Sequence, residues 1–252
     1  MTETYPVIFL AQSRGLTTGL PTYIAQRDLR FAIHPSQGEF PRIVVAPGDV
    51  EECFYITAEA FNLAEKFQMP TIIISDKYLS ESNGTTDQFD QSKIGIDRGQ
   101  LITEKKYTQE EEYMRHKITE NGISVRAIPG IKGAIVRTNA DEHNELGYTT
   151  EDPVLTTKMN DKRFKKLDGL TKELENHETI KLYGPKKADA TIVSWGSTKG
   201  PIREAMKVLK KKGKSVNFLQ ILFLYPFPVG KIKEQIQSAK KTIAVENNKT
   251  SQ

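Results

Sequence analysis

The chain has 252 residues, of which 37% are hydrophobic and 27% charged, a composition typical of a globular protein and not of a disordered one. The formal net charge of +4 is small and both signs are interspersed, so we do not expect a nucleic-acid-binding protein. The single cysteine, Cys53, excludes an intrachain disulfide and an iron–sulfur cluster ligated by this chain alone. No apolar run reaches transmembrane length and no basic-then-apolar leader opens the sequence, which predicts a cytoplasmic protein without a membrane partner.

An apolar run at residues 5–11 predicts a buried strand, because it is short, continuous and rich in β-branched and aromatic residues. The loop that follows carries Arg14, Gly15, Thr17, Thr18 and Gly19. Glycines at the carboxyl end of such a strand let the backbone approach a ligand, and ligands bind at that end in open α/β sheets. The arginine offers a planar charged fork for a carboxylate or phosphate. The chemistry of these residues indicates either a small-anion site or an ordinary surface loop.

The rest of the first half alternates helix and strand. Asp49 is placed to cap a helix with Glu52 at the capping-box position, and apolar residues follow at helical spacing: Val50, Cys53, Phe54, Phe61 and Ala64. Residues 71–75 then form a second buried strand, and strand–helix–strand passages of this length imply parallel pairing. Residues 83–130 lose periodicity, and we expect them to cross the surface or to contact a partner.

A charged helix from about 153 to 178 is expected to bridge two lobes, with an apolar face of Met159, Phe164, Leu167, Leu170 and Leu174. A second α/β unit follows, with strands at 190–194, 216–221 and 242–245. The sequence therefore predicts an α/β protein with two domains. Residues 1–152, with a surface extension at 83–135, form the first, and residues 153–252 form the second.

The same residues carry a resemblance. The chain is similar, over nearly all its length, to the α subunit of archaeal and bacterial 2-oxoacid:ferredoxin oxidoreductases, and most of all to the 2-oxoglutarate type. The resemblance rests on Arg14-Gly15 and on residues 18–22, 38–42, 46–53, 75–79, 96–99, 126–130, 150–153, 194–200, 226–228 and 245–248.

The resemblance implies the fold. Residues 1–152 correspond to the C-terminal part of a thiamine-pyrimidine-type domain, and residues 153–252 to a transketolase C-terminal-like domain. The family's N-terminal part, with its Tyr-Pro-Ile-Thr-Pro motif and activating glutamate, and its extreme C-terminus have no counterpart; Tyr5-Pro6-Val7-Ile8 lacks the threonine and second proline and is interpreted as plain strand. The family's Gly-Asp-Gly…Asn motif is also missing. Thiamine diphosphate, Mg²⁺ and the iron–sulfur cluster are therefore expected mainly on the partner subunit, and we expect no metal site here.

For the site, the resemblance implies that Arg14 binds the substrate carboxylate. Only Gly15, Leu16 and Thr17 separate Arg14 from Thr18, one residue fewer than the family's usual Gly-Gly-Pro-Ser spacing. Thr17 and Thr18 either hydrogen-bond the substrate or close the turn, with Gly15, Gly19, Gln26 and Asp28 giving loop and backbone support. Gln26 and Asp28 are expected to cap a helix or to contact the other domain.

The function that the resemblance implies is oxidative decarboxylation of a 2-oxoacid, 2-oxoglutarate foremost, with coenzyme A as acyl acceptor and ferredoxin as electron acceptor. A β subunit, and γ or δ subunits, would be partners. Pyruvate or another 2-oxoacid, or a truncated non-catalytic assembly subunit, remain alternatives. Two further patterns favour structural roles: residues 196–200 lack the phosphate-loop spacing and indicate a capped turn, and the spacing of Asp141, Glu142, His143 and Glu145 indicates a loop or domain contact and not a metal site.

Overall fold

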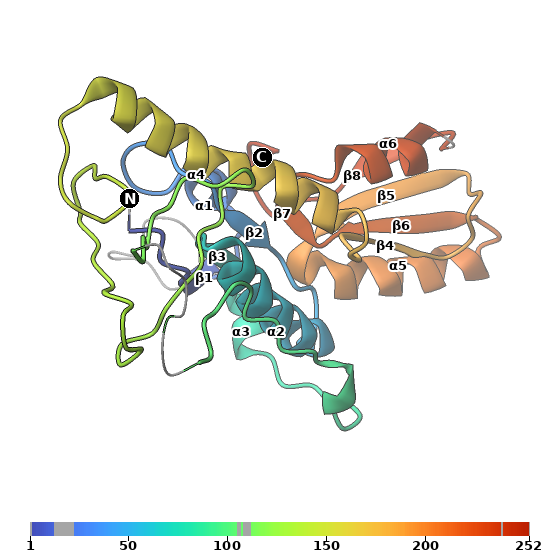
Figure 1. Cartoon of the computed structure of the whole chain (residues 1–252). Coiled ribbons are helices and arrows are strands. Elements are labelled where there is room, and N and C mark those ends of the chain that lie inside the picture. The colour runs from blue at the N-terminus through green and yellow to red at the C-terminus, as the bar shows by residue number, and fades with distance from the viewer. Residues whose placement is uncertain (1, 13–22, 105–106, 108–111, 238, 252) are drawn as a thin grey trace.

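The computed structural model describes residues 2–12, 23–104, 107, 112–237 and 239–251. It contains two four-stranded sheets, which lie side by side in Figure 1. The first sheet has the order β1 (Val7–Gln12), β3 (Thr71–Asp76), β2 (Ile43–Val45), β7 (Phe223–Tyr225). In it β1, β3 and β2 are parallel and β7 is antiparallel to β2.

The second sheet has the order β4 (Ile180–Tyr183), β6 (Val216–Ile221), β5 (Ala190–Trp195), β8 (Thr242–Ala244). Strand β5 is parallel to both β6 and β8, and β4 is antiparallel to β6. Helices α5 (Lys199–Lys211) and α6 (Val229–Gln237) lie on opposite faces of this sheet (Figure 1). The predicted α/β fold class is confirmed.

Helix α2 (Val50–Phe67) and the long helix α4 (Pro153–Leu174) cover one face of the first sheet. Their buried side chains form one core with those of β2 and β3; from the helices these are Ile56, Leu63, Phe67, Leu170 and Leu174. The other face packs on α1 (Leu29–Ile33) and on the second sheet, because Val44, Ile72 and Ile74 share a core with Trp195, Leu219 and Ile221. The two sheets are thus joined by a common hydrophobic core.

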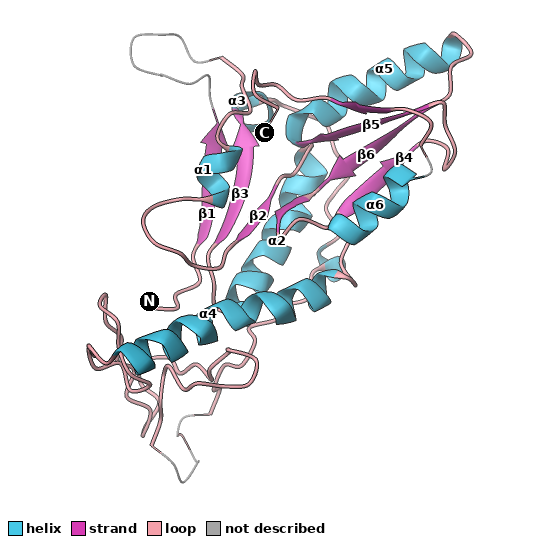
Figure 2. Ribbon diagram, turned by 90° about the horizontal axis from the view of Figure 1, so that it is seen from above, coloured by secondary structure: helices cyan, strands magenta, loops and turns pink. Residues whose placement is uncertain are grey.

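The remaining elements are short. Helix α3 (Lys77–Glu81) follows β3 directly, and two single 3₁₀ turns are η1 (Gln91–Lys93) and η2 (Gly196–Thr198). Between η1 and α4 the described residues contain no helix and only isolated β-bridges, which agrees with the loss of periodicity predicted for residues 83–130. In Figure 2 irregular loops gather around the end of α4 that lies away from the second sheet. Among the described residues no helix combines the length and apolar character needed to span a bilayer.

Three expectations about burial were wrong. Strand β1 is not buried: it is an edge strand of the first sheet, with Ile8 43% and Phe9 60% exposed. On α2, Phe61 is 54% exposed while Glu52 is buried. Cys53, also at one of the predicted apolar helix positions, is only half-buried, although burial still raises its pKa to about 11.

The predicted boundary at residue 152 is crossed by one strand. Strand β7 lies in the part of the chain assigned to the second domain, yet it pairs with β2 in the first sheet. It follows β6 after a single residue, Leu222, so the chain passes from one sheet into the other at this point. The division into residues 1–152 and 153–252 stays a prediction. The two predicted domains share a sheet, because β7 from residues 153–252 belongs to the sheet of residues 1–152.

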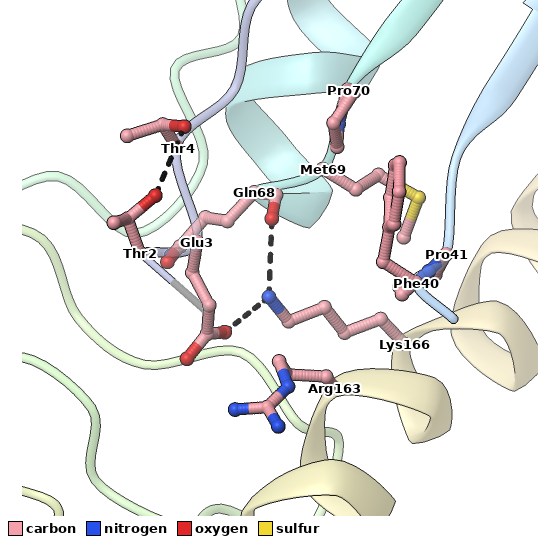
Figure 3. A pocket seen from close by; sticks show the side chains of 10 residues that line it. All are labelled: Thr2, Glu3, Thr4, Phe40, Pro41, Gln68, Met69, Pro70, Arg163 and Lys166. Carbon is pink, nitrogen blue, oxygen red and sulfur yellow. Dashed lines mark hydrogen bonds and ion pairs between the residues drawn. The ribbon is translucent and has the colours of Figure 1, made fainter. Parts of the chain in front are cut away.

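A buried ionic cluster lies at the amino ends of β1, β2 and β3, centred on Glu3 (Figure 3). The Glu3 carboxylate accepts hydrogen bonds from Lys162 Nζ at 2.5 Å and from Lys166 Nζ, and its Oε1 lies 3.3 Å from His116 Nδ1. The Arg115 guanidinium donates to the Glu3 carbonyl at 2.9 Å. This cluster fixes the segment before β1 to α4.

The cluster contains more basic groups than acidic ones, because a single carboxylate, that of Glu3, faces Lys162 and Lys166. Burial favours neutral Glu3, but the His116 hydrogen bond and the two lysines outweigh it and hold its pKa far below the usual range. Burial is also the largest influence on Lys166, and it lowers that pKa to about 8 despite Glu3. Lys166 further donates to the Gln68 carbonyl at 3.1 Å. A pocket of about 220 Å³ adjoins the cluster, but the charged groups that line it are paired with protein groups.

We predict that Glu3→Gln lowers the free energy of unfolding by about 3–5 kcal/mol, because it leaves buried lysines without a carboxylate. The contribution of the Glu3 carboxylate to the free energy of unfolding is complete above its unfolded pKa of 4.5. It is lost as the pH falls toward the lower pKa of the folded state. The wild type should therefore lose stability below about pH 4.5 more steeply than the variant. Urea denaturation across pH tests this, with exposed Glu151→Gln as the control. Equal stability of the variant and the wild type at pH 7 would contradict it.

We predict that the edge of β1 makes the chain self-associate, because Phe9 and Ile8 are exposed and, within the described residues, no strand pairs with β1 on its outer side. Phe9→Lys should weaken the association, since lysine blunts an edge. Phe61→Lys is the matched control, because Phe61 is similarly exposed but lies on a helix. Sedimentation velocity measures the outcome, and a wild-type monomer at roughly tens of micromolar would sink the prediction.

Candidate functional site

The candidate site lies at the carboxyl edge of the first sheet, where β1 and β3 end side by side. Gln12 ends β1 and is paired in register with Asp76, which ends β3; both side chains are buried. We call the parts of the chain built on the first and second sheets the first and second lobes. The turn η2, in the second lobe, packs against the end of β3 at the same edge. This is the end of a parallel sheet at which ligands bind in open α/β folds.

Gln12 closes the base of the segment that contains the arginine loop. Its Nε2 donates to the carbonyl of Ser75 on β3 at 3.3 Å, and its Oε1 accepts from the backbone N–H of Asp28 at 3.0 Å. One buried side chain thus ties the last residue before the loop to a residue beyond it and to the neighbouring strand. Gln12 was not predicted as a site residue, although a polar residue that ends an apolar strand is a visible signal.

Gln26 ties the far end of the same segment to the second lobe. It is fully buried, and its backbone N–H donates to the carbonyl of Asn247 at 2.9 Å. Its side-chain amide donates to the carbonyl of Trp195 at 3.3 Å, and Asn248 Nδ2 donates to the Gln26 carbonyl at 2.9 Å. Gln26 therefore contacts the other lobe, which is one of the two roles expected of it.

Asp28 occupies the N-cap position of α1, but its side chain makes no capping hydrogen bond. Burial is the largest influence on the carboxyl group and raises its pKa above the usual value, against the attraction of Arg27. Its backbone N–H is held by Gln12. Asp28 therefore does not cap the helix through its side chain, whereas its backbone N–H supports the base of the loop segment.

Arg14, Gly15, Thr17, Thr18 and Gly19 lie outside the described residues. Their roles in binding a substrate and in supporting the loop remain predictions.

Residues 196–200, interpreted as a capped turn, form a contact between the lobes. Ser197 Oγ donates to the Asp76 carboxylate, and the backbone N–H of Leu79 donates to the same carboxylate at 3.1 Å. Gly196 has φ +64°, and a Cβ there would lie 2.7 Å from Gln26 Nε2, so only glycine allows this approach. Helix α5 does begin here, but no side chain caps it.

A second contact between the lobes is centred on Glu52 of α2. Its carboxylate accepts from Lys199 Nζ at 2.6 Å, from Gln220 Nε2 at 2.7 Å and from the Gly48 N–H at 2.7 Å. Burial opposes the charge on Lys199, but hydrogen bonds to Asp49 and Glu52 outweigh it and raise the pKa of Lys199. Asp49 also caps α2 as predicted, accepting from the Glu52 N–H at 2.9 Å. This network aligns the carboxyl ends of the two sheets.

The Asp141–Glu145 stretch makes protein contacts instead of a metal site. The Arg163 guanidinium donates to both Glu142 carboxylate oxygens, and the ring of buried His143 lies 4.0 Å from that of His116 between centroids. Among the described residues, no group of three or more His, Cys, Asp or Glu side chains could hold a metal ion.

The fold and this edge define a two-lobed α/β protein whose lobes meet at the carboxyl ends of their parallel strands. Residues 1–161 match the family model described as pyruvate flavodoxin/ferredoxin oxidoreductase, thiamine diphosphate-binding, and residues 188–252 match pyruvate:ferredoxin oxidoreductase core domain II. The chain therefore belongs to the family of pyruvate flavodoxin/ferredoxin oxidoreductases.

Individual relatives agree. The chain is 38% identical over 244 residues to 2-oxoacid:ferredoxin oxidoreductase 2, subunit alpha, of Aeropyrum pernix. This match covers 96% of this chain and 37% of that protein. It is 29% identical over 251 residues to the 2-oxoglutarate synthase subunit KorA of Methanothermobacter marburgensis, covering 98% of this chain and 64% of the relative. The chain thus spans less than two thirds of the length of these relatives.

A solved structure matches the fold over almost the whole chain. It is the 2-oxoglutarate:ferredoxin oxidoreductase of Magnetococcus marinus, solved with 2-oxoglutarate, coenzyme A and succinyl-CoA bound. The match has a TM-score of 0.86 and 34% identity, and covers 99% of this chain and 42% of that one.

The described residues do not fit the diphosphate and metal of a thiamine cofactor. The buried carboxylate at the carboxyl edge, Asp76, is already engaged by Ser197 and by the Leu79 N–H. The Glu52 carboxylate is engaged by Lys199, Gln220 and Gly48. Neither carboxylate is available as a metal ligand.

We predict that Gln12→Ala accelerates tryptic cleavage after Arg14 by about fivefold or more. Removing the amide frees the Asp28 N–H and the Ser75 carbonyl, and loss of about 1 kcal/mol of local stability raises the open population by that factor. Mass spectrometry of the early cleavage products measures the rate, and exposed Gln88→Ala is the control. Unchanged cleavage in Gln12→Ala would mean that this side chain does not hold the loop.

Proposed function

We propose that the chain forms part of the α subunit of a 2-oxoacid:ferredoxin oxidoreductase that acts on 2-oxoglutarate. The observation that carries the proposal is the backbone match, over 99% of this chain, to an enzyme solved with 2-oxoglutarate, coenzyme A and succinyl-CoA bound. The similarity to a 2-oxoglutarate synthase subunit supports the same substrate.

In the proposed reaction the bond between the carboxylate and the keto carbon of the 2-oxoacid breaks and carbon dioxide leaves. The acyl carbon forms a bond to the sulfur of coenzyme A, and the thiol proton is released. The two electrons left by this oxidation pass to two ferredoxin molecules, each of which is reduced by one electron. Thiamine diphosphate, when bound, supplies the carbanion chemistry, and we place it, Mg²⁺ and the iron–sulfur cluster mainly on the β subunit.

This chain would bind and orient the substrate. Arg14 holds the substrate carboxylate with a bidentate, charge-assisted contact, and Thr17 and Thr18 either bond the substrate or close the turn. Gln12 and Gln26 support this role, because they attach the two ends of the loop segment to β3 and to the second lobe. A substrate-binding group needs such support, since small misplacements of a reacting group are costly in rate.

A non-catalytic assembly subunit is the second candidate. It is opposed by the buried contacts at the base of the arginine loop, which an assembly role alone does not need. Pyruvate or another 2-oxoacid as substrate remains the alternative within the enzymatic class.

We predict that Arg14→Lys, in the enzyme assembled with its β subunit, lowers catalytic efficiency for 2-oxoglutarate about ten- to a hundredfold. Lysine keeps the charge but loses the planar fork, and a charge-assisted contact is worth about 1.5–3 kcal/mol. The assay is 2-oxoacid-dependent reduction of a viologen dye, with pyruvate as a competing substrate. The KM for coenzyme A and the cofactor content should stay unchanged.

Arg27→Lys is the matched control, because Arg27 is exposed and lies just beyond the loop. An assembled wild-type complex without activity toward any 2-oxoacid would favour the assembly role. Wild-type efficiency in Arg14→Lys would show that another group holds the carboxylate.

A further inference from the structure

A cationic groove lies at the amino ends of β5 and β6, at the end of the second sheet that points away from the candidate site (Figure 1). Its volume is about 600 Å³, and its walls come from the end of β4, one side of α5 and the turn before β6. Four basic side chains line it, Arg203, Lys207, Lys210 and Lys214, and no carboxylate does. We refer to it as the α5 groove.

The positive charge of the α5 groove is only partly balanced by the protein. Lys207 pairs with Glu204 at 2.9 Å, but both side chains are about two-thirds exposed, and such a pair is weak. Within the described residues Arg203 and Lys210 form no ion pair, and the carboxylate near Lys214, that of Asp189, is paired with Lys240 at 3.0 Å. The groove therefore has a net positive charge.

Helix electrostatics explain only some of these cations. Lys210 and Lys211 lie in the last turn of α5, where the negative end of the helix dipole stabilises a positive charge. Arg203 lies about two turns earlier, where the dipole gives no such reason. The structure also holds Arg203 in place: its guanidinium lies 4.7 Å above the ring of Tyr183, which itself stacks on Phe218 at 5.7 Å. One donor of the groove is thus pre-organised.

From these observations we propose that the α5 groove binds a ligand that carries two or more phosphate groups. Guanidinium and ammonium groups are the side chains that recognise phosphate, and several of them around one concavity suit several phosphates. The volume lies in the range of small-molecule sites. Apolar wall residues, Pro185, Met206 and Val216, leave room for a non-phosphate part of the ligand.

The test is titration calorimetry of the full chain with inorganic tripolyphosphate and, separately, with ATP, at low and at moderate salt. Lys210→Gln/Lys214→Gln should weaken tripolyphosphate binding about five- to thirtyfold, since two contacts of about 0.5–1 kcal/mol each are lost. Lys211→Gln/Lys212→Gln is the matched control, because it removes the same charge from the same helix end outside the groove. It should change the affinity by less than about twofold.

The two ligands separate the sources of affinity. Equal affinity would mean that phosphates alone are recognised, and tighter ATP binding that the apolar wall also holds the nucleoside; either result supports the proposal. Absence of binding by both ligands, or an equal loss in the control pair, would overturn it. Groove-dependent binding of poly-glutamate without binding of tripolyphosphate would also overturn it and make the groove a protein-docking surface. No 2-oxoacid enters this test, so its outcome is independent of the proposed function.

Discussion

The buried carboxylate of Glu52 is the contact on which the relative placement of the two lobes depends. It is 4% exposed and takes hydrogen bonds from the first lobe, through the Gly48 N–H, and from the second, through Lys199 and Gln220. A charge this deep is tolerated only when it is fully paired, so both lobes must supply their donors together. The carboxyl ends of the two sheets consequently face one another, and Gln26, Asp76 and Gly196 come into reach across the junction.

Much of the fold could be predicted from the sequence, because long helices and strongly apolar strands carry a clear period. The strands at 71–76, 190–195 and 216–221 and the helix beginning at Val50 were predicted within about a residue at most ends. Strands β2, β4 and β7 were not; their three or four residues show little alternation, although the equally short β8 was predicted. They also pair with strands distant in sequence, which gives no local signal.

The predicted helix faces failed where charged residues are buried. On α4, Met159, Leu170 and Leu174 are buried as expected, but Lys162 and Lys166 are buried as well, while Phe164 and Leu167 are only partly covered. Periodicity arguments place lysine in solvent, and what reverses this is Glu3, a partner more than 150 residues away. The site follows the same logic: the arginine loop was visible as a motif, whereas Gln12 and Gln26 gain their roles from tertiary contacts.

The basic side chains discussed above form two groups, one buried and one exposed to solvent. Lys166 and Lys199 are buried, and each is held by carboxylates of the protein, because an unpaired charge there would be very costly. Arg203, Lys210 and Lys214 border an open groove, where water already solvates them and an unpaired charge costs little. A ligand there replaces water at exposed donors, so its affinity should fall as salt screens the attraction. The buried pairs, shielded from solvent, should keep the lobes together under the same conditions.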